Sequence, residues 1–219
     1  MPERLQFLNT LRPPAQLAEW MTLVRARVAL EDKANVEPAI EALRTLRDGS
    51  TDAALKGETQ VAISGARVAQ SKWEEAIEEI RLGLQYRGND WILLNNAAAI
   101  LNEHLNRPRE ALPFAERAYA LNRGVWQVSD TLAAAHWALG AKAEAIAKME
   151  EALRLVQSEV DKCRLSIKLA RWKHASGDVQ GARAMADRVR ESLADSPVLR
   201  DAVKSEYEAL VQEIGTSVR

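Results

Sequence analysis

The stretch LLNNAAAILNEHLNRPREALPFAERAYALN, residues 93–122, decides the fold of this 219-residue chain. It contains two runs rich in small and aliphatic residues, separated by Asn106-Arg107-Pro108. Apolar residues recur at helical spacing within each run, and an asparagine closely followed by a proline is typical of a break between helices. The stretch therefore predicts two helices joined by a short turn.

The second half of this stretch has counterparts along the chain, which read VEPAIEALRTL, WEEAIEEIRLGL, PREALPFAERAYAL, KAEAIAKMEEALRL and VQGARAMADRVRESL. Each of the five copies contains an alanine at the same register, and successive alanines are 37, 35, 34 and 37 residues apart: Ala39, Ala76, Ala111, Ala145 and Ala182. Each copy follows another helical run, such as VSDTLAAAHWAL before the fourth. A recurring two-helix unit of this length is the signature of a helical repeat array.

Residues that break or cap helices lie where this periodicity places the turn inside each unit. Asn and Ser side chains can accept hydrogen bonds from the first turn of a helix, and Gly tolerates positive φ. The expected breaks are Asn35, Ser71, Asn106-Arg107-Pro108, Gly140 and Gly177-Asp178.

In period, in its two-helix unit and in its small core residues, the chain resembles the tetratricopeptide repeat family, especially bacterial arrays, over roughly residues 20–193. The family's small site on the first helix corresponds to Arg27, Ser64, Ala99, Ala133 and Ala170, so copies three to five fit best and copy one worst. The family's proline after the second helix is missing from all five copies. The resemblance implies an all-α, right-handed α-solenoid of about five helix hairpins.

This reading divides the chain into an N-terminal half-repeat or cap helix at 1–19, five repeats over 20–193 and a capping helix with a tail at 196–219. The approximate repeat boundaries are 20–56, 57–91, 92–125, 126–162 and 163–195. The last helix is expected because Ser196 and Pro197 form an N-cap and first-turn pair before an amphipathic run.

The composition favours a soluble all-helical protein. Apolar residues make up 47% of the chain, while Gly, Pro and aromatic residues are scarce. The formal net charge of −1 provides no global field that would attract nucleic acid or an anionic membrane. A single cysteine, Cys163, excludes an intrachain disulfide, and neither a signal peptide nor a membrane span is apparent, so we expect a cytoplasmic protein as written. The compartment of any longer parent protein stays open.

In the family, the first helices of the pairs line a concave groove that holds a peptide or a partner helix. By register, the apolar end of this groove is expected to include Met21, Val24, Val28, Glu58, Val61 and Gly65, and Ile100 and Gln127 are expected to face it farther along. The candidate partner-binding residues are Asn96, Glu103, Asp130, Trp137, Arg164, Lys168, Arg171 and His174. The lysine–asparagine clamp that some family members use for chaperone tails is not expected, because those registers hold Val24 with Val28, Val61 with Gly65, and Asn96 with Ile100.

Three groups of charged or aromatic residues have expected roles. Arg164, Lys168 and Arg171 share a helix face and form either an anion site or a surface neutralised by Glu206, Glu208 or Glu213. Most tryptophans are expected to pack in the core, with Trp137 the best candidate for an interface anchor. Glu74, Glu75, Glu78 and Glu79 are expected to form a solvated convex surface.

No catalytic, metal or cofactor site is predicted. The three histidines are never three or four residues apart, Cys163 and His174 are too distant along one helix to touch, and no glycine-rich phosphate loop occurs. The sequence therefore predicts a non-enzymatic scaffold that binds a protein or peptide. A structural spacer or self-associating module, including a homo-oligomer, is the alternative, and RNA binding is disfavoured by the neutral net charge.

Overall fold

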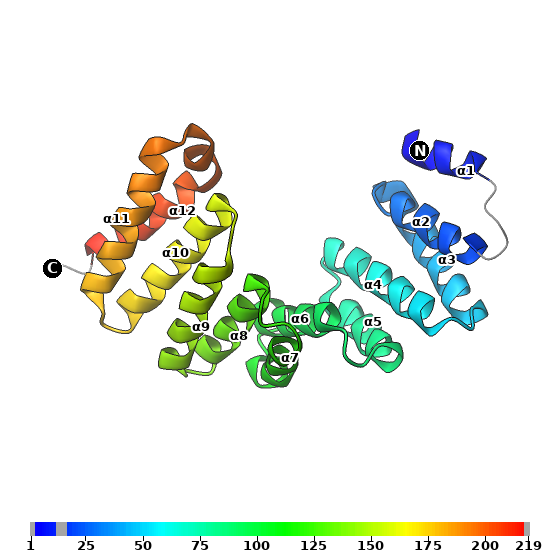
Figure 1. Ribbon diagram of the computed structural model, residues 1–219, viewed down its shortest axis with the longest axis horizontal. Helices are drawn as coiled ribbons and strands as arrows, with labels where there is room; N and C mark the ends of the chain where they lie inside the picture. The colour runs from blue at the N-terminus through cyan, green and yellow to red at the C-terminus, as the bar shows by residue number, and fades with distance from the viewer. Residues whose placement is uncertain (1–2, 12–16, 217–219) are drawn as a thin grey trace. The chain divides into compact units, whose positions relative to one another are not determined.

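The computed structural model describes residues 3–11 and 17–216, and every regular element among them is helical. In chain order the elements are α1 (Glu3–Thr10), α2 (Ala18–Ala29), the short 3-10 turn η2 (Lys33–Asn35), α3 (Val36–Gly49), α4 (Ala53–Ala69), α5 (Trp73–Tyr86), α6 (Trp91–Ala99), the π-helix η3 (Ile100–His104), α7 (Pro108–Leu121), α8 (Trp126–Ala138), α9 (Lys142–Leu155), α10 (Glu159–Ala175), α11 (Val179–Asp195) and α12 (Pro197–Thr216) (Figure 1). The all-α class and the helical-repeat architecture predicted from the sequence are confirmed.

The chain forms two compact units, Met1–Asn106 and Arg107–Arg219. In the first unit, α2 packs against α3, α3 against α4, and α4 against α5. In the second unit, α7 packs against α8, α8 against α9, α9 against α10, and α10 against α11. Within each unit, consecutive helices are therefore neighbours, as a stack of helix hairpins requires.

Four of the five predicted breaks contain a residue with positive φ, and Asn35 is the exception. Ser71, Asn106, Gly140 and Gly177 all have positive φ, at 58°, 52°, 82° and 89°. At three of these turns, the backbone N–H one residue later donates to a carbonyl five positions back, as Lys72 does to Arg67, Ala141 to His136 and Asp178 to Lys173. This is the Schellman arrangement, which satisfies carbonyls at the end of a helix.

The prediction that Asn35 and Ser71 cap the following helices was wrong. No side-chain cap bond precedes α3, and the Asn35 amide donates instead to Asp32 Oδ2 at 2.7 Å. The positive φ at Ser71 explains its role as the left-handed residue that ends α4, which asparagine and glycine perform in the other turns.

Three apolar clusters account for part of the core of the described residues, and further buried residues such as Ile80 and Leu94 lie outside them. One joins α2, α3 and α4 through residues such as Leu23, Leu43 and Ile63. The second joins α8, α9 and α10, and the third joins α10, α11 and α12. Because Val203 and Leu210 of α12 are fully buried in the third cluster, α12 covers the apolar side of α10 and α11. The Ser196 hydroxyl accepts a hydrogen bond from Leu199 N at 3.3 Å, which begins this helix.

Candidate partner-binding site

The predicted binding residues are divided between the two units. Asn96 and Glu103 lie on α6 and η3 in the first unit. In the second unit, Asp130 and Trp137 lie on α8, while α10 carries Arg164, Lys168, Arg171 and His174. Since α8 and α10 are the first helices of successive hairpins, the second unit gathers six of the candidates on two such helices.

An ion pair joins α8 to α10 at the centre of this set. Lys168 Nζ donates to Asp130 Oδ1 at 2.7 Å, and both side chains are partly exposed, at 32% and 22%. The Lys168 ammonium is also 5.3 Å from the centroid of the Trp172 ring. Asp130 and Trp172 therefore hold Lys168 in place, and the Asp130 carboxylate neutralises its charge.

Trp137 of α8 stacks on Trp172 of α10, and a lysine ammonium lies near each ring. The Trp137 ring is parallel to that of Trp172, with centroids 4.8 Å apart, and the Lys142 ammonium is 5.6 Å from its centroid. Lys142 is anchored by a 3.1 Å bond to the Ala175 carbonyl. Trp172 is buried and Trp137 is half-buried, so part of the Trp137 side chain stays accessible to a partner.

The remaining cations of α10 are paired with the capping helix. Arg164 Nε lies 3.3 Å from Glu206 Oε1, and Arg171 Nε lies 3.1 Å from Glu213 Oε2. Both guanidinium groups also donate to backbone carbonyls of α12, at Ala202 and Glu206. Glu206 and Glu213, two of the three glutamates named from the sequence, thus neutralise these arginines. The geometry supports a neutralised surface and not an open anion site.

The candidates of the first unit show a shift in register. Ile100, expected to face the groove, is buried at 4% exposure. Ala98 is fully buried while Ala99 is only half-buried, so the small core position is one residue earlier than the alignment of alanines indicated. Asn96 is half-buried and Glu103 is exposed.

Two asparagines beside these candidates were missed by the sequence reasoning. The Oδ1 atoms of Asn95 and Asn102 are buried and have no hydrogen-bond partner among the described residues. They are seven residues apart and lie on opposite sides of the junction where α6 becomes the π-helix η3. A π-turn adds one residue per turn and alters which side chains share a face, and such turns are common at functional sites. If Ala98 instead of Ala99 is taken as the small core position, the predicted groove-facing position moves from Asn96 to Asn95. That alignment would have named Asn95 as a candidate.

The apolar end of the predicted groove consists of α2 and α4 in the first unit. Val24 is exposed at 42%, and Gly65 is exposed with open space where a side chain would begin. Glu58, predicted to face a partner, is bonded to Arg27 and Arg87 within the unit. Burial opposes ionisation of Glu58, but these two arginines outweigh it, and the pKa of the carboxyl is lowered.

The prediction of a solvated acidic surface on α5 was only half correct. Glu78 is exposed, but Glu79 is 9% exposed and its carboxylate receives a hydrogen bond from Arg44 at 2.6 Å and one from the Gln60 amide at 2.9 Å. Glu75 lies 3.0 Å from the buried Arg67. Glu75 therefore joins the two helices of its own hairpin, and Glu79 also contacts Arg44 of the preceding hairpin, which their acidic spacing alone did not indicate.

Catalytic and metal chemistry has little geometric support in the described part of the chain. Cys163 is buried at 3% exposure, and burial raises the pKa of its thiol, which disfavours the nucleophilic thiolate. Across residues 3–11 and 17–216, no three His, Cys, Asp or Glu side chains cluster as metal ligands would. None of the described helices combines the length and the apolar character that crossing a bilayer requires.

No family model and no curated protein matches the chain. Solved structures match it at low sequence identity. MamA from Desulfovibrio magneticus RS-1 is 16% identical, with 82% of this chain and 97% of that chain covered and a TM-score of 0.71. BtubC (BKLC) from P. vanneervenii is 16% identical, with 88% of each chain covered and a TM-score of 0.73. YrrB, described as a TPR protein with an unusual peptide-binding site, is 15% identical, with 87% of this chain and 94% of that chain covered and a TM-score of 0.66.

Proposed function

Because the chain has the tetratricopeptide-repeat fold, we propose that it is a non-enzymatic scaffold that holds a peptide or helix of a partner protein against its first helices. The likeness to YrrB supports the proposal, since that protein of the same fold is described as having a peptide-binding site. At 15% identity the likeness concerns the fold alone, and the candidate residues come from this chain.

The observation that carries the proposal is the set of partly exposed polar groups on α8 and α10. Asp130 and Lys168 form a partly exposed pair, and the half-buried Trp137 lies on α8 together with Asp130. Tryptophan is enriched among residues that anchor interfaces. Asn96 and Glu103 are the corresponding candidates in the first unit.

The ion pairs that the cations of α10 already form limit the kinds of ligand that can bind to this helix. Arg164 and Arg171 already contact Glu206 and Glu213, and Lys168 contacts Asp130. An acidic peptide would have to displace these carboxylates, whereas a polar peptide of low net charge can bond to the exposed groups without breaking them. We therefore propose a ligand of low net charge for the second unit.

Site-specific photocrosslinking in cells of the source organism tests the proposal. Gln127 is an exposed residue of α8, and Glu144 is an exposed residue of the second helix α9 in the same hairpin. Each is replaced in turn by a benzophenone amino acid, and crosslinked proteins are identified by mass spectrometry. The proposal expects a specific adduct from position 127 and none from position 144.

Equal adducts from the two positions, or none from either, would contradict binding at the first helices. A structural spacer would then be the better account. Adducts consisting only of this chain would favour the self-associating alternative.

A further inference from the structure

We infer that the outward face of α2, together with Phe7 of α1, is a docking surface for a short amphipathic helix of a partner protein. This inference rests on the proposed scaffold function and assigns a partner class to the first unit. The apolar face is defined by Phe7, Leu17, Trp20, Val24 and Val28.

Helix α2 is apolar on two opposite faces. Leu23 and Ala26 point into the core, with 2% and 6% exposure. Trp20, Val24 and Val28 are spaced four residues apart and therefore share the other face, with Leu17 three residues before Trp20. A surface helix normally has one apolar stripe and one polar face, and a helix apolar all round is typical of a buried one. The second stripe of α2 indicates a surface that another molecule covers.

The charged residues of α2 do not solvate this outward face, because each is bonded to a neighbouring helix or turn. The Glu19 carboxylate accepts a hydrogen bond from the Ser50 hydroxyl at 2.7 Å. Arg25 donates to the carbonyls of Leu8 and Leu11, at 3.2 and 2.8 Å. Arg27 donates to Glu58 on α4 at 2.7 Å. These are all the acidic and basic side chains of α2.

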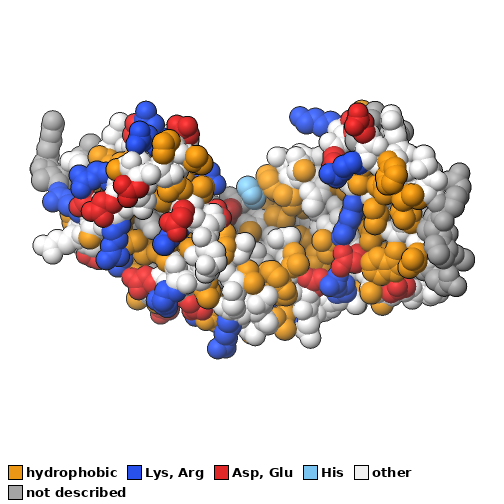
Figure 2. Space-filling model, turned by 45° about the horizontal axis from the view of Figure 1, so that its top comes forward, with side chains coloured by type: hydrophobic (Ala, Val, Ile, Leu, Met, Phe, Trp, Pro, Cys, Tyr) orange, Lys and Arg blue, Asp and Glu red, His pale blue; other side chains and the backbone are white. Residues whose placement is uncertain are grey.

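The exposed fractions confirm that the face is open. Phe7 is exposed at 65%, Leu17 at 54%, Val24 at 42% and Trp20 at 36%. In Figure 2, hydrophobic side chains gather on the surface of the first unit, at the right of the view. Four large apolar side chains are therefore exposed on or beside this face.

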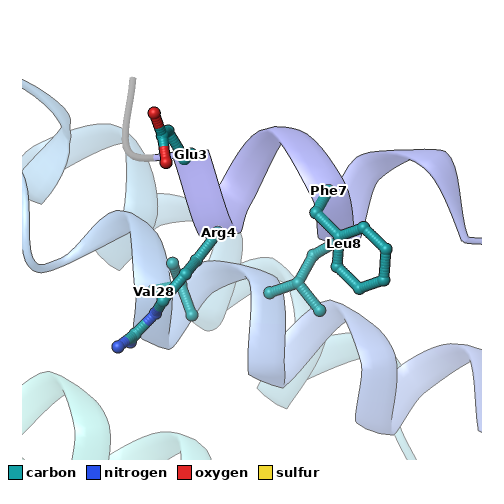
Figure 3. Close-up of a pocket in the computed structure, with 5 residues that line it drawn as sticks. All are labelled: Glu3, Arg4, Phe7, Leu8 and Val28. Atoms are coloured by element: carbon teal, nitrogen blue, oxygen red, sulfur yellow. The ribbon is translucent and has the colours of Figure 1, made fainter.

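A hollow between α1 and α2 borders this face. It has a volume of about 420 Å³ and is lined by Glu3, Arg4, Phe7, Leu8 and Val28. Figure 3 shows Arg4 and Leu8 extending from α1 toward α2, on which Val28 lies. The hollow can accommodate a large apolar side chain of the partner, of the kind that anchors a helix in a groove.

The exposed area of the apolar face and the charges at its border together indicate which molecule covers it. A stable dimer buries about 800 Å² per partner, so two copies of this face are too small to hold one another on their own. The stripe from Leu17 to Val28 is roughly 16 Å long, which matches about three turns of a helix. The charges at its border are paired internally, Arg4 with Glu31 and Arg27 with Glu58, so the fit requires no charge on the partner's docking side.

The test uses the full chain and a display library of 16-residue helix-forming peptides with an Ala, Glu and Lys background and eight randomised positions. Peptides are selected on the wild-type chain and then measured against Val24→Lys. Ala42→Lys is the matched control, since it places the same charge at an exposed position of α3. Circular dichroism checks that both variants keep the wild-type helicity.

We expect selected peptides to carry apolar residues at i, i+3 or i+4, and i+7. Their affinity should fall at least about tenfold with Val24→Lys and stay unchanged with Ala42→Lys, and it should persist in 1 M salt. The inference is overturned if no peptide is enriched, if the enriched peptides depend on charge, or if Val24→Lys has no effect. It is also overturned if the chain is a dimer that Val24→Lys dissociates, because a second copy is then the occupant.

Failure here would leave the crosslink from Gln127 unaffected, because that position lies in the second unit. The two results therefore separate a wrong partner class for the first unit from a wrong scaffold function.

Discussion

The two units of this chain stabilise the same type of hairpin by different means. Among the described residues, the first unit buries seven polar or charged side chains: Ser50, Thr59, Gln60, Ser64, Arg67, Glu79 and Asp90. The second unit buries two, Ser129 and Thr131, and neither carries a charge. Both units have apolar cores and surface ion pairs, but buried hydrogen bonds add to the packing in the first unit, and close contact of alanines dominates the buried contacts of the second.

A buried polar network around Glu79 is the main feature of the first unit. Gln60 donates to the backbone carbonyl and the carboxylate of Glu79, and Glu79 also pairs with Arg44. Gly83 makes room for this arrangement, since a Cβ there would lie 3.1 Å from Gln60 and 2.9 Å from a methyl group of Leu93. The small residue at this position in copy two thus leaves room for the side chains of Leu93 and Gln60.

In the second unit, the corresponding positions hold alanines packed to zero exposure. Ala118 and Ala152 lie on second helices, and Ala133 and Ala170 on first helices. Small side chains let backbones approach, and dense apolar packing needs few buried polar groups. The difference predicts that the second unit is sensitive to side-chain volume and the first unit to charge.

The largest effect is expected from a larger side chain in the second unit. Ala152→Leu places extra methyl groups where Ala152 has no exposed surface, and it should lower the free energy of unfolding by about 3 kcal/mol. Urea denaturation followed by circular dichroism measures the change. Ala147→Leu on the same helix is the control, because Ala147 is exposed and the substitution should change stability by less than about 0.5 kcal/mol.

Removal of one buried charge should break the network of the first unit. Glu79→Gln keeps the side-chain shape but leaves Arg44 without its carboxylate, and the expected loss is about 2 kcal/mol, because Arg44 is partly exposed to water. The same urea titration applies. Glu78→Gln changes the neighbouring exposed residue, and an equal loss from both substitutions would contradict the role assigned to Glu79.

Acid should weaken the first unit through Glu37. Hydrogen bonds from Arg67, Gln70 and Lys72 lower the pKa of this carboxyl from 4.5 to about 2, with Arg67 the largest contributor. Because the folded-state pKa lies below the unfolded one, the stabilisation is present above pH 4.5 and is lost as the pH falls through about 2. Its size is about 1 kcal/mol after allowance for the exposed carboxyl.

Glu37→Gln isolates this contribution. The stability difference between the wild-type chain and Glu37→Gln should be about 1 kcal/mol at pH 6 and near zero at pH 2. Glu41→Gln, at an exposed position of the same helix, corrects for general effects of charge removal. A difference that does not change with pH would contradict the assignment.

The smallest effect is expected at the ion pair between α8 and α10. A double-mutant cycle with Asp130→Asn and Lys168→Met should give a coupling energy of about 0.5 kcal/mol, because both side chains are partly exposed. The coupling should decrease in 1 M salt. A coupling above about 2 kcal/mol would mean that the pair is a main structural contact of the second unit.

The sequence was sufficient to predict the hairpins because their turns depend on local chemistry. Gly140 and Gly177 adopt the positive φ that glycine favours, and the periodic alanines lie against neighbouring helices. Copy one was expected to fit worst, and Arg27 at its small site is indeed exposed and bonded to Glu58. The family resemblance predicted the fold that the solved structures share.

Contacts between hairpins could not be predicted in the same way. Glu79 and Arg67 look like ordinary surface charges in the sequence, and their burial depends on partners about 20 to 35 residues away. The π-helix after Ala99 shifted the register of Ile100, since no local residue marks the extra backbone step. Arg164 and Arg171 were named with their glutamate partners, but only the position of α12 decides which glutamate each one contacts.

Hydrogen–deuterium exchange of the chain with and without the partner captured through position 127 tests the central claim most directly. We predict slower exchange in α8 and α10, the first helices of their hairpins, with little change in α9 and α11. Protection confined to α9 and α11, or no protection in any helix, would contradict a scaffold that binds through its first helices.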